Sequence, residues 1–108
     1  MDFGFSAEEE AFREDVRRFL KQEVTDGVRA EVESGMGFGP HTWGLLRKLG
    51  AERWLTPQWP EKYGGMGATY VQKFIIQEEL AYAGGPETLI AVSMAGPVVL
   101  RYGSEEQK

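Results

Sequence analysis

Segments rich in glycine and proline divide this chain, and each stretch between them carries apolar residues at helical spacing. These segments are residues 34–39, 54–67, 84–86 and 96–97. Glycine and proline both disfavour the interior of regular elements, so helices or strands are expected only between the segments. No stretch alternates apolar and polar residues with the period of two that a half-buried strand requires. The sequence therefore predicts one all-α domain over residues 1–108, an irregular or orthogonal bundle of about five to six helices.

The first helix has a well-marked start. Ser6 and Glu9 have the spacing of a capping box, in which each side chain bonds the backbone N–H of the other residue. Apolar residues then recur on one face at Phe12, Val16, Phe19, Leu20 and Val24. The pairs Glu9–Arg13 and Glu14–Arg18 lie four residues apart, and we expect them on a solvated opposite face with no chemical role.

Two further helices have clear boundary signals. Pro40 suits the first turn of a helix, and Gly50 is expected to end it. Thr69 and Gln72 form a second capping box, so a central helix is expected from there to Gly84. His41 is the only histidine, and without neighbouring ligands or a nucleophile it is interpreted as structural.

The last third of the chain predicts two short apolar helices, at residues 88–94 and 98–102, the second ended by Gly103. A third capping box, formed by Ser104 and Gln107, signals a helix start only one residue before Lys108. From this signal we infer, as a hypothesis, that the chain is part of a longer protein.

Charge and composition exclude several classes of function. Lys and Arg number 12 against 17 Asp and Glu, a net charge of −5 that disfavours nucleic acid and anionic membranes as partners. There is no cysteine, hence no disulfide or thiolate metal site, and no metal site is predicted. No run of about 18 apolar residues and no export signal occurs, so no membrane span and a cytoplasmic location are predicted.

Local motifs do not identify a catalytic residue. The loop Gly64-Gly65-Met66-Gly67 precedes a helix, but it follows no hydrophobic strand and lacks the third glycine of a dinucleotide fingerprint. Glu78 and Glu79 are adjacent, and neighbouring helical residues point about 100° apart, so they cannot act together on one substrate atom. We expect them to make structural hydrogen bonds or to face water.

The order of three motifs along the chain is more specific than any single residue. They are Leu55-Thr56-Pro57-Gln58-Trp59-Pro60-Glu61-Lys62-Tyr63-Gly64-Gly65-Met66-Gly67, Gln77-Glu78-Glu79-Leu80-Ala81-Tyr82-Ala83-Gly84 and Tyr102-Gly103-Ser104-Glu105-Glu106-Gln107-Lys108. Together with the opening Phe5-Ser6-Ala7-Glu8-Glu9, this order resembles the N-terminal domain of acyl-CoA dehydrogenases. The resemblance extends to the last residue of the chain.

The resemblance implies an FAD-dependent enzyme that desaturates an acyl-CoA thioester between its α and β carbons. In such enzymes a carboxylate removes the α-proton while a hydride leaves the β-carbon for the flavin. Flavin and base would lie mainly outside these residues, so no catalytic residue is assigned and the chain alone is expected to be inactive. The implied partners are acyl-CoA, the other domains of the same subunit, a homotetramer or related assembly, and an electron-transfer flavoprotein.

The resemblance also implies that the segment after the Glu-Glu-Leu-Ala motif forms one wall of the acyl pocket. The candidates in this segment are Ile90, Ala91, Met94 and Val98. Plain core packing is the alternative for each of them. The short link at residues 84–86 leaves the pocket depth open, so fatty acyl, branched acyl and steroid side-chain thioesters all fit.

Two other functions are compatible with the same residues. One is a free-standing helical module that binds a partner through an exposed apolar surface. The other is a non-catalytic subunit of a dehydrogenase assembly. The mass of the natural protein separates the module from the enzyme, because the enzyme needs further domains.

Overall fold

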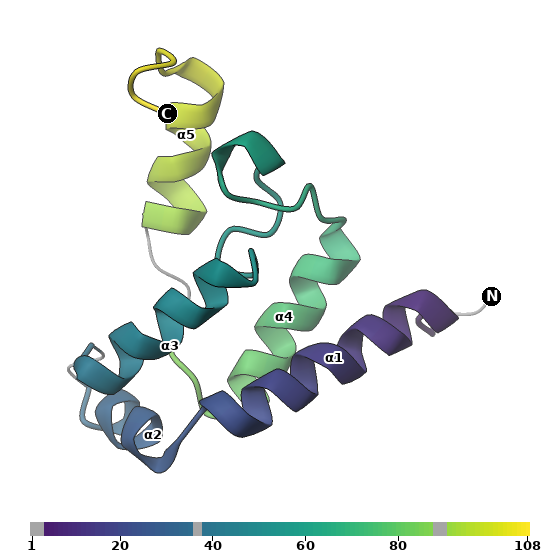
Figure 1. The fold of residues 1–108 in the computed structure, drawn as a ribbon, viewed down its shortest axis with the longest axis vertical. Helices are drawn as coiled ribbons and strands as arrows, with labels where there is room; N and C mark the ends of the chain where they lie inside the picture. The colour runs from purple at the N-terminus through teal and green to yellow at the C-terminus, as the bar shows by residue number, and fades with distance from the viewer. Residues whose placement is uncertain (1–3, 36–37, 88–90) are drawn as a thin grey trace.

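The chain is described by a computed structural model that covers residues 4–35, 38–87 and 91–108. It contains five α-helices, a 3₁₀ turn η1 and a π-helical turn η2 (Figure 1). Their bounds are α1 Ala7–Glu23, α2 Asp26–Glu33, α3 Pro40–Ala51, η1 Glu61–Tyr63, α4 Tyr70–Tyr82, η2 Ala91–Ala95 and α5 Gly96–Tyr102. The described residues include no strand, and the all-α prediction is confirmed.

The core lies where α1, α3 and α4 meet. Its buried residues are Val16, Leu20, Val24, Val28, Leu45, Leu46, Leu49, Ile75 and Ile76. Trp54, just after α3, packs edge-on against two rings of α1, with ring centroids 6.0 Å from Phe12 and 5.1 Å from Phe19. These contacts bury the apolar stripe that the sequence predicted for the first helix.

Both capping boxes that begin long helices are present. Ser6 accepts from the Glu9 N–H while Glu9 accepts from the Ser6 N–H, at 3.1 and 2.8 Å. Thr69 and Gln72 make the same reciprocal pair at the start of α4. These predictions are confirmed because every atom of such a box lies within four consecutive residues.

Helix α2 was not predicted. The chain leaves α1 at Val24, whose backbone is extended, and Thr25 then caps a new helix by accepting from the Val28 N–H. Val24 and Val28 are both buried, so the apolar spacing continues across the break and hides it from a periodicity search.

The predicted end of α3 was wrong. Gly50 lies inside the helix, which continues to Ala51, and the left-handed residue that ends it is Arg53 at φ 65°. The N–H groups of Arg53 and Trp54 bond the carbonyls of Gly50 and Leu49, which is a Schellman motif. Helix α4 ends in the same motif, with Gly84 at φ 82° as predicted.

The last third of the chain differs from expectation in two places. The predicted helix at 88–94 falls partly outside the described residues, and its described part belongs to the π turn η2, which runs directly into α5. The box of Ser104 and Gln107 forms, but it closes only a single turn. Among the described helices none is long and apolar enough to cross a bilayer.

Candidate functional site

A cavity of about 100 Å³ lies between α3, α4, the loop that follows α3, and residues 86, 87, 92, 93 and 97 of the segment after α4. Apolar side chains form most of its lining: Leu46, Leu49, Trp54, Leu55, Pro57, Trp59, Ile76, Leu80, Pro86, Val92 and Pro97. The remaining lining residues are Thr56, Gln58, Lys73, Gln77, Glu87 and Ser93. A few polar groups on an apolar wall are the usual composition of a small-molecule site.

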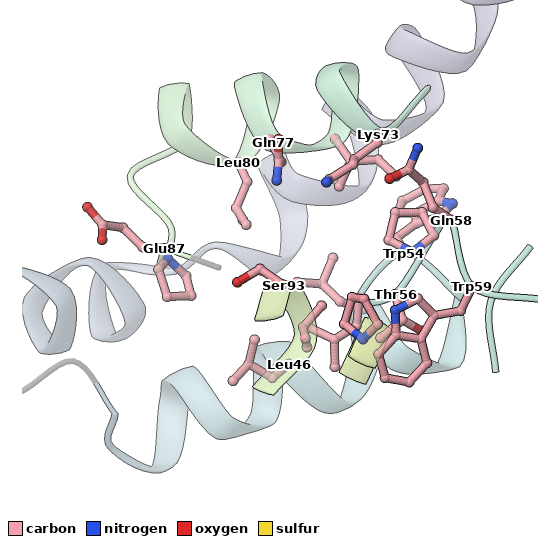
Figure 2. Close-up of a pocket in the computed structure, with 17 residues that line it drawn as sticks. Leu46, Trp54, Thr56, Gln58, Trp59, Lys73, Gln77, Leu80, Glu87 and Ser93 are labelled. Atoms are coloured by element: carbon pink, nitrogen blue, oxygen red, sulfur yellow. The ribbon is translucent and has the colours of Figure 1, made fainter. Parts of the chain in front are cut away.

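The polar groups are not evenly distributed around this cavity. Figure 2 shows Lys73, Gln77 and Leu80 in a row along α4, with Glu87 at the end away from Trp54 and Trp59. Lys73 and Gln77 lie one helical turn apart and so share a face of α4. The sequence analysis missed both residues, although their i,i+4 spacing, which places two polar side chains on one face of α4, was a usable signal.

The four predicted pocket residues do not line this cavity as a group. Ile90 lies outside the described residues, and Ala91 is placed only as the first residue of η2. Met94 and Val98 are 65% and 58% exposed and are absent from the lining, whereas their neighbours Val92, Ser93 and Pro97 belong to it. The segment therefore has a cavity side and an outer apolar side, and the predicted role of the outer side stays a prediction.

The glycine loop before α4 has no free amides for a phosphate. The N–H groups of residues 64–68 all bond backbone carbonyls of residues 57–61, at 2.9 to 3.2 Å. A cradle for the FAD pyrophosphate needs such N–H groups to point at the ligand. This loop does not fit the cofactor, in agreement with the sequence interpretation.

Two features hold this loop in place. A Cβ on Gly65 would lie 1.9 Å from the Trp59 carbonyl oxygen, so only glycine fits there. The Arg53 guanidinium donates to the carbonyls of Glu61 and Gly65, at 3.0 and 2.9 Å. Arg53 therefore both ends α3 and fixes the loop that lines one end of the cavity.

Glu79 is buried, with 5% exposure, in the interface between α1 and α4. Its carboxylate accepts from Arg17 Nη2 and Nε at 2.7 and 3.0 Å, and from Arg13 Nε at 2.9 Å. The hydrogen bonds from Arg17 lower the Glu79 pKa against the opposing effect of burial, and those from Arg13 add to this. Glu79 is thus an ionised structural group, as predicted.

Glu78 accepts a single hydrogen bond from Arg13 Nη2, at 3.2 Å. The interpretation of the α1 charges as a solvated face was wrong for Arg13, because this side chain crosses to α4 and pairs with both glutamates. Arg18 pairs with Asp15 rather than with the predicted Glu14. Spacing along one helix could not predict the pairs that Arg13 forms, because the competing carboxylates lie more than 60 residues away.

Glu31 of α2 caps the start of α3, where Gly39 offers no side chain. Its carboxylate accepts from the N–H groups of Gly39, His41 and Thr42 and from the Thr42 hydroxyl, at 2.7 to 3.2 Å. Desolvation opposes ionisation of Glu31, but the bonds from Thr42 and His41 prevail and lower its pKa to about 2. His41 contributes through its backbone N–H, which agrees with a structural role.

The described residues contain no group of three His, Asp or Glu placed to hold a metal ion. The carboxylates of Glu79 and Glu31 are engaged in structural hydrogen bonds. The lining of the cavity includes one amine, that of Lys73, and Met94 and Val98 next to the lining residues are exposed and apolar.

The family of this fold is established by comparison with known proteins. The model of the family "Acyl-CoA dehydrogenase, N-terminal domain" matches residues 6–108. The chain therefore belongs to the acyl-CoA dehydrogenase family, as its N-terminal domain.

Similar proteins differ in what their names say they act on. The chain is 34% identical to the mitochondrial long-chain specific acyl-CoA dehydrogenase of Sus scrofa, covering 95% of this chain and 24% of that protein. It superposes on the Tcur3481-Tcur3483 steroid ACAD with a TM-score of 0.84 and 30% identity, over 99% of this chain and 28% of that one. The ChsE4-ChsE5 complex from Mycobacterium tuberculosis gives a TM-score of 0.83 and 26% identity, over 99% and 27%.

The chain thus spans about a quarter of the length of the proteins it matches. The oxidoreductase family is shown by these matches.

Proposed function

We propose that this chain is the N-terminal domain of an FAD-dependent acyl-CoA dehydrogenase and supplies one wall of the acyl pocket without a catalytic group of its own. The observation that carries the proposal is the family match over residues 6–108. The geometry supports it, because an exposed apolar face follows α4 where the acyl wall is expected.

This wall is the outer side of η2 and α5. Three large apolar side chains are exposed on this side: Met94 at 65%, Val98 at 58% and Tyr102 at 75%. Contiguous exposed apolar surface on a domain marks a contact with a ligand or another domain. We propose that the acyl chain and the other domains of the same subunit cover this face.

The reaction proposed is α,β-desaturation of an acyl-CoA. A bound flavin would supply the acceptor for the hydride that leaves the β-carbon. Removal of the α-proton requires a carboxylate that can reach substrate, and neither Glu79 nor Glu31 can do so while bonded to arginines or to the start of α3. The structural engagement of these two carboxylates supports the proposal that the base, like most flavin contacts, lies outside these 108 residues.

The partners proposed follow from the family. Acyl-CoA is the substrate, an electron-transfer flavoprotein accepts the electrons, and the whole protein assembles as a homotetramer or a related complex in the cytoplasm. The ChsE4-ChsE5 complex is a relative that assembles from two different chains, so a mixed assembly is included. Long-chain and steroid substrates occur among the names of similar proteins, and both classes stay candidates.

The test is a chain-length series with the Met94→Trp variant of the full-length protein. A larger ring on the acyl wall should reduce kcat/KM for long or bulky acyl-CoA more than for short ones. Met94→Leu, which nearly conserves volume, is the matched control and should leave the series unchanged. An equal loss at every chain length would remove Met94 from the pocket.

Two measurements, the intact mass of the natural protein and its flavin content, distinguish the dehydrogenase from the alternative, a free-standing interaction module. An intact mass several times 12.1 kDa, with bound flavin, supports the dehydrogenase. A natural protein near 12.1 kDa without flavin would favour the module.

A further inference from the structure

We infer that the cavity between α3 and α4 is a binding site for a small apolar ligand that ends in a hydrogen-bond acceptor, a carboxylate or a carbonyl, which Lys73 holds. This site is distinct from the acyl wall proposed above. Val92, Ser93 and Pro97 face the cavity, whereas Met94 and Val98 lie on the other side of the same segment.

The charge of Lys73 is the first observation. Its side chain is partly buried among cavity residues and forms no ion pair or hydrogen bond with the described part of the chain. Other partly buried charges among the described residues are paired, as Arg13 is with Glu78 and Arg29 is with Asp26. An ammonium group with three donors and no partner favours an acceptor that a ligand can bring.

The position of Glu87, the only carboxylate among the described residues that line the cavity, strengthens this argument. Glu87 is exposed and lies at the end of the cavity away from the tryptophans, on the other side of Leu80 from Lys73 (Figure 2). The other polar residues of the lining, Thr56, Gln58, Gln77 and Ser93, carry no charge. The end of the cavity at Lys73 is therefore positive, which complements an anion or a carbonyl oxygen and disfavours an amine.

The apolar lining and the size define the rest of the ligand. Leu46, Leu49, Ile76 and Leu80 supply aliphatic surface, and Trp54 and Trp59 supply rings. A water-sized group needs roughly 10–15 Å³ of such space, so a cavity of about 100 Å³ takes about seven to ten of them. That is the size of a short carboxylic acid or ketone, and far smaller than acyl-CoA.

The experiment is a titration of the full-length protein with hexanoate, hexan-2-one, hexanol and hexylamine. Binding is measured by calorimetry and by tryptophan fluorescence. Trp54→Phe assigns the fluorescence change to this cavity. Hexanoate is expected to bind more tightly than hexanol, and hexylamine not to bind. Binding of the ketone as well would identify a neutral carbonyl as sufficient, and its absence would identify a carboxylate as required.

The Lys73→Met variant tests the assigned residue. Loss of a hydrogen bond to a charged group should weaken hexanoate binding about tenfold or more and leave hexanol within about twofold. Lys73→Arg should retain much of the hexanoate affinity. Lys21→Met removes a positive charge from an exposed position on α1 and should leave the hexanoate affinity unchanged.

Three results would overturn the inference: no hexanoate binding, equal binding of hexanoate and hexylamine, or unchanged hexanoate affinity in Lys73→Met. An unchanged melting temperature of Lys73→Met ensures that the variant is folded. Because the readout is binding rather than turnover, failure of this inference is separate from failure of the proposed dehydrogenase activity.

Discussion

Two helix junctions in this domain are each organised by a single carboxylate, but the donors differ in kind. At the α1–α4 junction the donors to Glu79 are the guanidinium groups of Arg13 and Arg17. At the α2–α3 junction the donors to Glu31 are three backbone N–H groups and one hydroxyl. In both places a residue type that could serve as an acid or base is committed to holding helices together.

The two junctions should respond differently to removal of the carboxylate, because the donors and the burial of the carboxylate differ. Glu79 is buried, so its removal takes the buried counter-charge away from Arg13 and Arg17 and leaves them only the more exposed carboxylates of Glu78 and Glu14. Glu31 is more accessible, and two of the three backbone N–H groups that it accepts from belong to Gly39 and His41, which are partly or fully exposed, whereas Thr42 is buried. The first junction should therefore depend more on its carboxylate than the second.

The largest effect is expected for Glu79→Ala. Breaking a fully buried ion pair costs about 3–5 kcal/mol, and here about 2–3 kcal/mol is expected because Arg13 and Arg17 can turn toward solvent. Urea unfolding measures this change. Glu78→Ala, one residue away and in a partly exposed pair, is the matched control and should cost under about 1 kcal/mol. Equal losses in the two variants would show that burial of Glu79 is not what matters.

A smaller loss is expected for Glu31→Gln at neutral pH. The amide can accept fewer bonds and carries no charge to favour the start of α3, so the melting temperature should fall by less than in Glu79→Ala. Glu33→Gln is a suitable control, because Glu33 lies exposed on the same helix. A melting temperature below that of Glu79→Ala would reverse the ranking of the two junctions.

The pH dependence sharpens the comparison further. The Glu31 pKa falls from 4.5 to about 2 on folding, so its contribution is complete above about pH 4.5 and is lost as the pH falls toward 2. The difference in melting temperature between the wild type and Glu31→Gln should therefore shrink over this window. The Glu79 pKa is lowered as well, so Glu79→Gln should show the same direction. A difference that grows in acid would contradict both assignments.

The smallest effect expected is that of salt. Arg17 is half exposed, so concentrated NaCl should weaken its attraction to Glu79 slightly, whereas the short hydrogen bonds to Glu31 should hardly respond. The stability difference between wild type and Glu79→Ala should narrow in salt more than that between wild type and Glu31→Gln. The opposite order would mean that Glu31 acts mainly through charge.

Sequence reasoning succeeded where all the interacting atoms are close along the chain. The boxes at Ser6 and Thr69 and the end of α4 at Gly84 depend on spans of a few residues, and all three were predicted. The end of α3 was mispredicted, because Arg53 adopts a left-handed backbone that usually requires glycine and is held by bonds to Glu61 and Gly65.

The site was predicted less well than the fold. Lys73, Trp54 and Val92 line one cavity although about 20 residues separate each from the next, and no local pattern brings them together. Likewise, the cap that Glu31 gives to α3 depends on how two helices meet. The structural hydrogen bonds expected of Glu79 are the part of the site prediction that the geometry supports most directly.

The central claim is that this domain gives a dehydrogenase its scaffold and an acyl wall but no acid or base. The most direct test is acyl-CoA dehydrogenation by the full-length protein with Glu79→Gln or Glu31→Gln, at a temperature where the variants are folded. The account predicts desaturation of acyl-CoA with kcat per folded molecule close to that of the wild type. A loss of several orders of magnitude in a folded variant, or no desaturation by the wild type, would contradict it.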